Sequence, residues 1–271
     1  MSANAMDHPE KLRILHLTDS HLLPEPGRTF LGMDTELSLR SVIQLVNGGG
    51  RSFDFVLFTG DLAQEANERS YQRVAAACAE LPLPCYCLPG NHDDAHLMRE
   101  FLPQQSLRWE PWLRTGAWLI VCLDSTVPGS PAGTLAPEEL LFLDGVLQDH
   151  PDCPTLIALH HHPIPCGSLW MDSMMLTNAD DLFRVLERHP QVRLVLHGHA
   201  HQVVDIQRER IRVLGSPSTC FQFTPYSWTF SLDPSPPGYR WIEVDSAGSI
   251  ATGICRLPQP CTGLDLSSTG Y

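Results

Sequence analysis

The sequence predicts an α/β protein in which helices cover the faces of β-sheets. Two observations lead to this prediction. Short apolar runs alternate with helix-like segments through most of the chain, and five of these runs are followed at once by a cluster of aspartate, asparagine or histidine residues. Because ligands of open α/β sheets gather beyond the carboxyl ends of the strands, the five clusters are expected to meet at one edge.

The five apolar runs are rich in Ile, Val, Leu and Phe and have the length of buried strands. They cover residues 12–17, 53–58, 85–88, 156–159 and 194–196. Four helix-like segments, each followed by glycine or proline, cover residues 35–46, 67–81, 137–148 and 178–188. This alternation predicts helices that pack on the sheet faces.

The pattern changes after residue 201, where short extended pieces are separated by turns. A mixed, partly antiparallel second sheet fits these pieces, with a turn at Asp245-Ser246-Ala247-Gly248. The expected strands cover residues 203–207, 211–214, 228–232, 239–244 and 250–255. Residues 258–271 lack periodicity and are rich in Ser, Thr and Gly, so we expect one catalytic domain over residues 11–257 and a loose C-terminal tail over residues 258–271.

Composition restricts the partners of the chain. Its 271 residues are 43% hydrophobic, which is enough for a full core, and the net charge of −13 argues against a nucleic-acid partner, since such affinity depends on Lys and Arg. Residues 1–10 do not have the pattern of a secretory signal, and the apolar stretch at 117–123 is too short to cross a bilayer. We therefore expect a soluble cytoplasmic protein without a membrane partner, and the sequence leaves its oligomeric state unknown.

The five polar clusters are the main functional signal. They are Asp19-Ser20-His21, Gly60-Asp61, Gly90-Asn91-His92-Asp93, His160-His161-His162 and Gly198-His199-Ala200-His201. Together they offer enough carboxylate, amide and imidazole ligands for two metal ions, and such a mixture suits Mn, Fe or Zn better than Mg or Ca. A carboxylate can bridge two cations, and we expect Asp61 to be the shared ligand.

The histidine triplet leaves its ligand open. In strand geometry His160 and His162 point to one face and His161 to the other, and only one of the three is expected to bind metal.

Two metals about 3.5 to 4 Å apart can clamp the attacking and departing oxygens of a phosphate displacement and lower the pKa of a bridging water. A sugar alkoxide is a poor leaving group, so a proton donor is needed, and the sequence places His92 for that role.

These motifs resemble, in order and spacing, those of the calcineurin-like metallophosphoesterase superfamily over about residues 12–201. Within it, the chain is similar to the bacterial class III phosphodiesterases that act on 3′,5′-cyclic AMP, through residues 59–64, 88–93, 160–163 and 217–220. The resemblance implies a four-layer α/β/β/α sandwich with two mixed sheets. It also implies two bound metal ions, divalent or of mixed valence, drawn from Fe, Mn and Zn.

The resemblance further implies roles for individual residues. One metal would be bound by Asp19, His21, Asp61 and His201. The other would be bound by Asp61, Asn91, His160 and His199, where His160 is preferred to His161 because a strand end fixes geometry more firmly than a loop. His92 would be catalytic, and the substrate phosphate would be contacted by His21, Asn91 and His92.

The implied reaction is hydrolysis of 3′,5′-cyclic AMP to 5′-AMP by a hydroxide that bridges the two metals. Two alternatives stay open: a broader phosphodiesterase for 2′,3′-cyclic nucleotides or glycerophosphodiesters, and a non-catalytic scaffold of the same fold. Several aromatic residues could stack on a purine or could equally belong to the core. They are Trp170, Phe221, Phe223, Tyr226 and Trp228.

Overall fold

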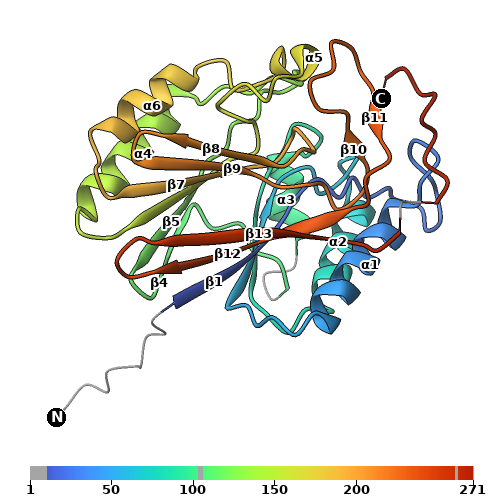
Figure 1. Cartoon of the computed structure of the whole chain (residues 1–271), viewed down its shortest axis with the longest axis horizontal. Helices are drawn as coiled ribbons and strands as arrows, with labels where there is room; N and C mark the ends of the chain where they lie inside the picture. The colour runs from blue at the N-terminus through green and yellow to red at the C-terminus, as the bar shows by residue number, and fades with distance from the viewer. Residues whose placement is uncertain (1–10, 103–105, 260–261, 271) are drawn as a thin grey trace.

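The computed structural model describes residues 11–102, 106–259 and 262–270. Two β-sheets face each other, and helices lie on the outer side of each (Figure 1). The buried side chains between the sheets form an apolar layer of their own, distinct from the layers beneath the helices. This arrangement confirms the predicted α/β/β/α sandwich with two mixed sheets.

The first sheet has five strands in the order β13-β12-β1-β2-β3. Its parallel strands are β1 (Lys11–Leu17), β2 (Phe55–Thr59) and β3 (Cys85–Leu88), and its antiparallel strands are β12 (Gly238–Asp245) and β13 (Ile250–Arg256). Its outer face is covered by α1 (Thr35–Gly48), α2 (Glu68–Cys78) and α3 (Ala95–Phe101). Alternation along β1 places Leu15 and Leu17 beneath these helices and Ile14 against the other sheet.

The second sheet has six strands in the order β4-β5-β6-β7-β9-β8. Its four central strands are parallel: β5 (Trp118–Cys122), β6 (Thr155–Ala158), β7 (Val192–His197) and β9 (Ile211–Gly215). The two antiparallel outer strands are β4 (Trp112–Thr115) and β8 (Val204–Arg208). Its outer face is covered by α4 (Pro137–Asp149) and α6 (Ala179–Glu187). No helix of the described chain has both the length and the apolar character of a membrane span.

The predicted strand over 228–232 is wrong. The strand found there, β11 (Leu232–Asp233), is limited to two residues and pairs with β10 (Gln222–Phe223). Trp228 lies in the connecting loop with 80% of its surface exposed, so its aromatic character does not reflect burial in a sheet. Short helix α5 (Leu169–Asp172) and strands β4 and β5 were not expected either, although β5 coincides with the apolar stretch at 117–123.

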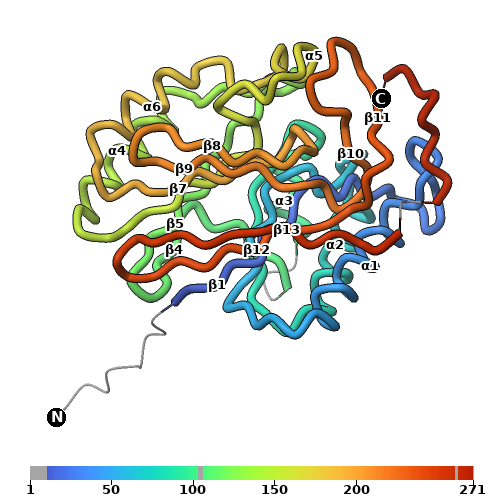
Figure 2. Tube along the Cα trace, in the orientation of Figure 1, coloured from blue at the N-terminus to red at the C-terminus, as the bar shows by residue number. Residues whose placement is uncertain are grey.

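The C-terminal segment lies at the same end of the molecule as the β10–β11 hairpin (Figure 2). Residues 262–270 contain neither helix nor strand, yet they contact the rest of the protein. The backbone N–H of Asp265 donates to the carbonyl oxygen of Leu31 at 2.9 Å, and Leu264 packs on a buried apolar cluster. These contacts differ from the loose tail expected from composition, and the domain boundary at residue 257 stays a prediction.

Candidate metal centre

The structure brings together all seven residues that the sequence predicted as metal ligands. The loops after β1, β2, β6 and β7 meet at one edge, where the Asp19 N–H donates to Gly60 O and the Gly198 N–H donates to His160 O, both at 3.0 Å. Four groups of side chains there have potential ligand atoms within 4.8 Å of one another. The groups are Asp19, His21 and His201; His21, Asp61 and His92; Asp19, Asp61 and His160; and His160, His161 and His199.

The carboxylate of Asp61 lies between the two halves of the cluster. Its Oδ2 atom is 3.6 Å from Nε2 of His21 and 3.3 Å from Nε2 of His160. Its Oδ1 atom accepts a hydrogen bond of 2.9 Å from the backbone N–H of His92. Because one carboxylate oxygen faces both halves, Asp61 has the position expected of a shared ligand.

In the half of the cluster that contains His21 and His201, the two rings are held so that their Nε2 atoms face each other at 3.2 Å. The Nδ1 atom of His201 donates to the carbonyl oxygen of Phe221 at 2.8 Å, and Nδ1 of His21 donates to the side-chain oxygen of Gln64 at 2.7 Å. Because Nδ1 carries the hydrogen bond in each ring, Nε2 is the atom that faces the cluster. The carboxylate of Asp19 completes this half, 3.4 Å from Nε2 of His201.

The other half of the cluster contains His160, Asn91 and His199. The Nδ1 atom of His160 donates to Thr59 O at 2.8 Å, which turns its Nε2 atom toward Asn91 Oδ1 at 3.1 Å. The ring of His199 lies 5.0 Å from that of His160, centroid to centroid. His160, rather than His161, thus lies beside both Asp61 and Asn91.

His161 was the alternative to His160, and the structure places it at the edge of the same cluster. Its ring centroid is 4.7 Å from that of His199, and its Nδ1 atom forms a 2.8 Å hydrogen bond with Oγ of Ser125. Strand alternation could not predict this arrangement, because β6 ends at Ala158 and the histidines follow in a loop.

Residues beyond the predicted set also hold the cluster. The hydroxyl of Ser218 donates to Asp19 O at 2.8 Å, and the N–H of Thr219 donates to Thr18 O at 3.1 Å. These contacts fix the turn that carries Asp19. The sequence singled out residues 217–220 only through the family resemblance, and no spacing rule predicted their role.

The backbone at the cluster is strained. Among the described residues, eight non-glycine residues have positive φ, and five of them belong to the predicted ligand set: Asp19, His21, Asp61, His199 and His201. Such conformations are costly for side chains with a Cβ and are concentrated at functional sites. Gly60, with φ of 92°, is needed for close approach, because a Cβ there would lie 2.5 Å from Nδ1 of His160.

Burial and neighbouring charges set the protonation of the cluster. Burial alone would raise the pKa of Asp61, but the imidazoles of His160 and His92 outweigh it and hold that pKa well below its usual range. Burial lowers the pKa of His21 to about 3 and, together with His161, lowers that of His199 well below its usual range. The rings of His21 and His199 are therefore neutral at pH 7, as metal ligation requires.

These residues fit a pair of metal ions. His199 is 1% exposed, and neither of its ring nitrogens has a hydrogen-bond partner among the described residues. A buried polar atom without a partner is costly, and a cation would satisfy it. The cluster combines carboxylate, amide and imidazole donors without cysteine, which suits Mn, Fe or Zn in a catalytic site.

A cavity of about 440 Å³ adjoins the cluster at Asn91 and His92. Trp170 is the one predicted stacking residue in its lining, since Phe221 and Phe223 are buried while Tyr226 and Trp228 are exposed. The other lining residues are Gly129, Ser130, Pro131, Met174, Phe230 and Gly270. Its position makes this cavity the candidate substrate site.

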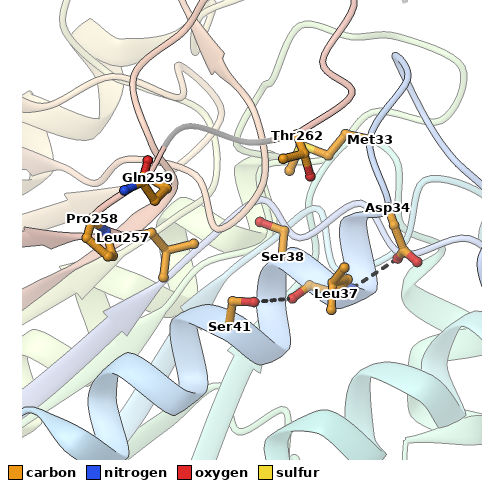
Figure 3. A pocket seen from close by; sticks show the side chains of 9 residues that line it. All are labelled: Met33, Asp34, Leu37, Ser38, Ser41, Leu257, Pro258, Gln259 and Thr262. Atoms are coloured by element: carbon orange, nitrogen blue, oxygen red, sulfur yellow. Dashed lines mark hydrogen bonds between the residues drawn. The ribbon is translucent and has the colours of Figure 1, made fainter.

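A second cavity, of about 290 Å³, lies between the start of α1 and a set of C-terminal residues, namely Leu257, Pro258, Gln259 and Thr262 (Figure 3). Its lining contains one acidic side chain, Asp34, whose carboxylate accepts from the Leu37 N–H at 3.0 Å and thereby caps α1. None of the predicted ligands lines it.

Residues 12–203 match the family described as calcineurin-like phosphoesterase. The chain belongs to the calcineurin-like phosphoesterase family. The matched range contains all seven predicted metal ligands, together with His92. Members of this family are dimetal hydrolases, in agreement with the cluster at the sheet edge.

Several relatives of this calcineurin-like phosphoesterase are similar over nearly their whole length. The chain is 39% identical over 258 residues to 3′,5′-cyclic adenosine monophosphate phosphodiesterase CpdA of Pseudomonas aeruginosa. The aligned region covers 95% of this chain and 94% of the relative. It is 38% identical over 261 residues to the CpdA phosphodiesterase of Vibrio vulnificus, and the aligned region covers 96% of this chain and 95% of that relative.

Solved structures share the fold at low sequence identity. A dimetal phosphatase from Danio rerio superposes with a TM-score of 0.61 at 14% identity and covers 89% of this chain and 98% of its own. GAP50, the anchor in the inner membrane complex of Plasmodium, superposes with a TM-score of 0.62 at 14% identity, and the superposition covers 96% of this chain and 87% of GAP50. Since one is a phosphatase and the other an anchor, these similarities support the fold of the calcineurin-like phosphoesterase and not its activity.

Proposed function

We propose that this calcineurin-like phosphoesterase hydrolyses 3′,5′-cyclic AMP to 5′-AMP in a metal-dependent reaction. The observation that carries the proposal is the convergence of Asp61 with six other oxygen and imidazole donors, beside a cavity of about 440 Å³. The substrate is inferred from the relatives, which share 38 to 39% of their residues with this chain and are named as phosphodiesterases of that nucleotide.

The proposed ligands divide into two sets that share Asp61. One metal would be held by Asp19, His21, Asp61 and His201, and the other by Asp61, Asn91, His160 and His199. When bound, two such ions supply Lewis acidity to the phosphate and lower the pKa of a water molecule toward neutrality. The identity of the metals, among Mn, Fe and Zn, is part of the proposal.

The side chains at the rim would act on the substrate directly. The oxygen of the Asn91 amide faces His160, so its NH₂ group is left to donate to a phosphate oxygen. His92 is half-buried, and its ring lies 5.0 Å from that of His21 at the edge of the cavity. In the reaction, water gives up a proton to solvent as its oxygen bonds to phosphorus and the bond from phosphorus to the 3′ oxygen breaks. His92 donates a proton to the departing 3′ oxygen and regains one from solvent.

The buried position of His21 favours metal binding over the predicted contact with the substrate phosphate. Its side chain is completely buried, and its ring nitrogens face Gln64 on one side and His201 and Asp61 on the other. We therefore assign His21 first to the metal and assign phosphate binding to Asn91 and His92.

Two observations bear on the alternative functions. The cavity contains Trp170, Met174 and Phe230, an apolar lining that favours a nucleotide over a glycerophosphodiester. The donor set has no missing member, which favours an enzyme over a scaffold such as an anchor of the same fold.

The test compares substrates on the Mn-loaded protein. We would measure kcat/KM for 3′,5′-cyclic AMP, 2′,3′-cyclic AMP, glycerophosphocholine and a nitrophenyl phosphodiester by product chromatography. The proposal expects the highest value for 3′,5′-cyclic AMP, with 5′-AMP as the product. A higher value for another natural substrate would refute the substrate assignment, and a folded, metal-loaded protein without any turnover would favour the scaffold.

A further inference from the structure

The C-terminal segment, defined as residues 262–270, connects the two cavities. Thr262 lines the cavity beside α1 (Figure 3). Gly270, at the other end of the segment, lines the candidate substrate cavity together with Asn91 and His92. The segment therefore extends from the surface of α1 to the rim of the metal centre.

The segment is held against the loop before α1 by a close backbone approach. Gly32 and Gly263 both have positive φ, 80° and 87°, and a Cβ added to Gly263 would lie 2.5 Å from the carbonyl oxygen of Gly32. A Cβ added to Gly32 would in turn overlap the carbonyl oxygen of Gly263. With the hydrogen bond from Asp265 to Leu31, this contact requires glycine on both sides.

Side-chain packing also holds the C-terminal segment in this position. Leu264 packs on the buried cluster that contains Met33 and Phe221. Phe221 in turn lies against the candidate metal ligands, with its ring centroid 5.3 Å from that of His21. The segment thus packs on the side chains that back the metal centre.

The candidate substrate cavity has two chemically different ends. Asn91 and His92 supply polar groups beside the metal centre, whereas Trp170, Met174 and Phe230 supply apolar and polarisable surface. The ring of Trp170 is fixed edge-on against Phe223 and Phe230, with centroid distances of 4.9 and 5.4 Å. A nucleotide has the same division, with a phosphate at one end and a flat, largely apolar base at the other.

We propose that the C-terminal segment is the outer wall of a subsite for the nucleoside half of the substrate, whose inner wall is Trp170, Met174 and Phe230. The assignment of a nucleotide to this cavity rests on the proposed function. Displacement of the segment then weakens contact with the nucleoside and leaves the phosphate contacts in place.

The test separates nucleoside binding from phosphate binding. Hydrolysis of a nitrophenyl phosphodiester by the Mn-loaded, full-length protein is inhibited with 5′-AMP and, separately, with inorganic phosphate. Gly263→Ala and Gly32→Ala push the segment away from opposite sides of the same contact. Each variant raises the inhibition constant of 5′-AMP roughly five- to tenfold, because the loss of a few tens of Å² of apolar contact weakens binding by that factor. Each changes the inhibition constant of inorganic phosphate by less than about twofold.

Two further variants control for backbone strain and for the inner wall. Gly27→Ala introduces a side chain at a similar positive φ, 71°, where no atom lies within 4 Å, and it leaves both inhibition constants unchanged. Met174→Ala removes part of the inner wall without touching the contact between the glycines, and it reproduces the selective loss of 5′-AMP binding. Metal content and circular dichroism establish that each variant is folded and loaded.

Several results would overturn the inference. They are equal inhibition of the unchanged protein by 5′-AMP and phosphate, a parallel rise of both constants in Gly263→Ala and Gly32→Ala, and no rise in either. An equal effect of Gly27→Ala would also overturn it. Turnover of 3′,5′-cyclic AMP is measured separately, so a protein without that activity but with the selective 5′-AMP effect would refute the proposed function and keep the subsite.

Discussion

His160 and Asp61 come from different sheets and meet at 3.3 Å, from Nε2 of the imidazole to Oδ2 of the carboxylate. Asp61 follows β2 in the first sheet, and His160 follows β6 in the second. The Nδ1 atom of the same imidazole donates to Thr59 O, so both ring nitrogens of His160 lie against residues at the carboxyl end of β2. The candidate metal centre therefore links the two sheets at their common edge.

Asp61→Asn removes the shared carboxylate charge from the centre. We expect the metal content to fall from two ions per chain to one or fewer and kcat/KM for 3′,5′-cyclic AMP to fall by at least about a hundredfold, while the fold is kept. Elemental analysis after gel filtration and steady-state kinetics measure the two effects. Asp205→Asn is the control, because it changes a carboxylate on the outer strand β8 that pairs with Arg212 on β9. This variant should keep both the metal content and kcat/KM.

His92→Gln tests the proton donor. We expect kcat for 3′,5′-cyclic AMP to fall by about 10² to 10⁴, because the 3′ alkoxide leaves poorly without a proton. A nitrophenyl phosphodiester, whose leaving group needs no proton, should lose far less. His96→Gln, on the exposed side of α3, serves as the control, and equal losses with both substrates would contradict the assignment.

Gly60→Ala places a methyl group 2.5 Å from Nδ1 of His160 and forces a positive φ on a residue with a Cβ. We expect the free energy of unfolding of the metal-free protein to fall by about 1 to 3 kcal/mol and metal affinity to fall with it. Urea unfolding and metal titration measure these quantities. Gly116→Ala, at φ of 58° with no atom within 4 Å, separates strain from overlap and should leave metal affinity unchanged.

The buried ring of His16 makes stability depend on pH. Burial, together with the Arg240 guanidinium and His197, lowers its pKa from 6.5 to about 3 in the folded protein. Between these values the unfolded chain binds a proton that the folded chain does not, so stability is present above pH 6.5 and is lost as the pH falls. His16→Gln should reduce the slope of unfolding free energy against pH by up to about 1.4 kcal/mol per pH unit.

That slope is best measured by urea unfolding between pH 7 and pH 5 in the presence of a chelator, so that metal binding does not contribute. Glutamine can replace the hydrogen bond of 2.8 Å between Nε2 of His16 and Oγ1 of Thr59. Equal slopes for the two proteins would show that His16 is not the group that titrates.

The sequence predicts which side chains converge at the sheet edge, because donors that directly follow buried strands have few alternative positions. Asp61 and His160 were placed in this way, since β2 and β6 are both fully buried runs. The loop conformation of residues 228–231 was not predicted, because the exposed Trp228 resembles a residue of a strand. The contact between Gly32 and Gly263 was missed because it depends on tertiary packing, which no local pattern encodes.

The position of β1 in its sheet affects how the protein is made. Strand β1 lies between β2 and β12, and residues 218 and 219 hold the turn that follows it. On the ribosome, one edge of β1 stays unpaired until residues 238–245 have been synthesised. Asp19 and His21 are therefore expected to become fixed only after β12 has paired with β1, so a fragment that ends before residue 238 should lack a finished metal site.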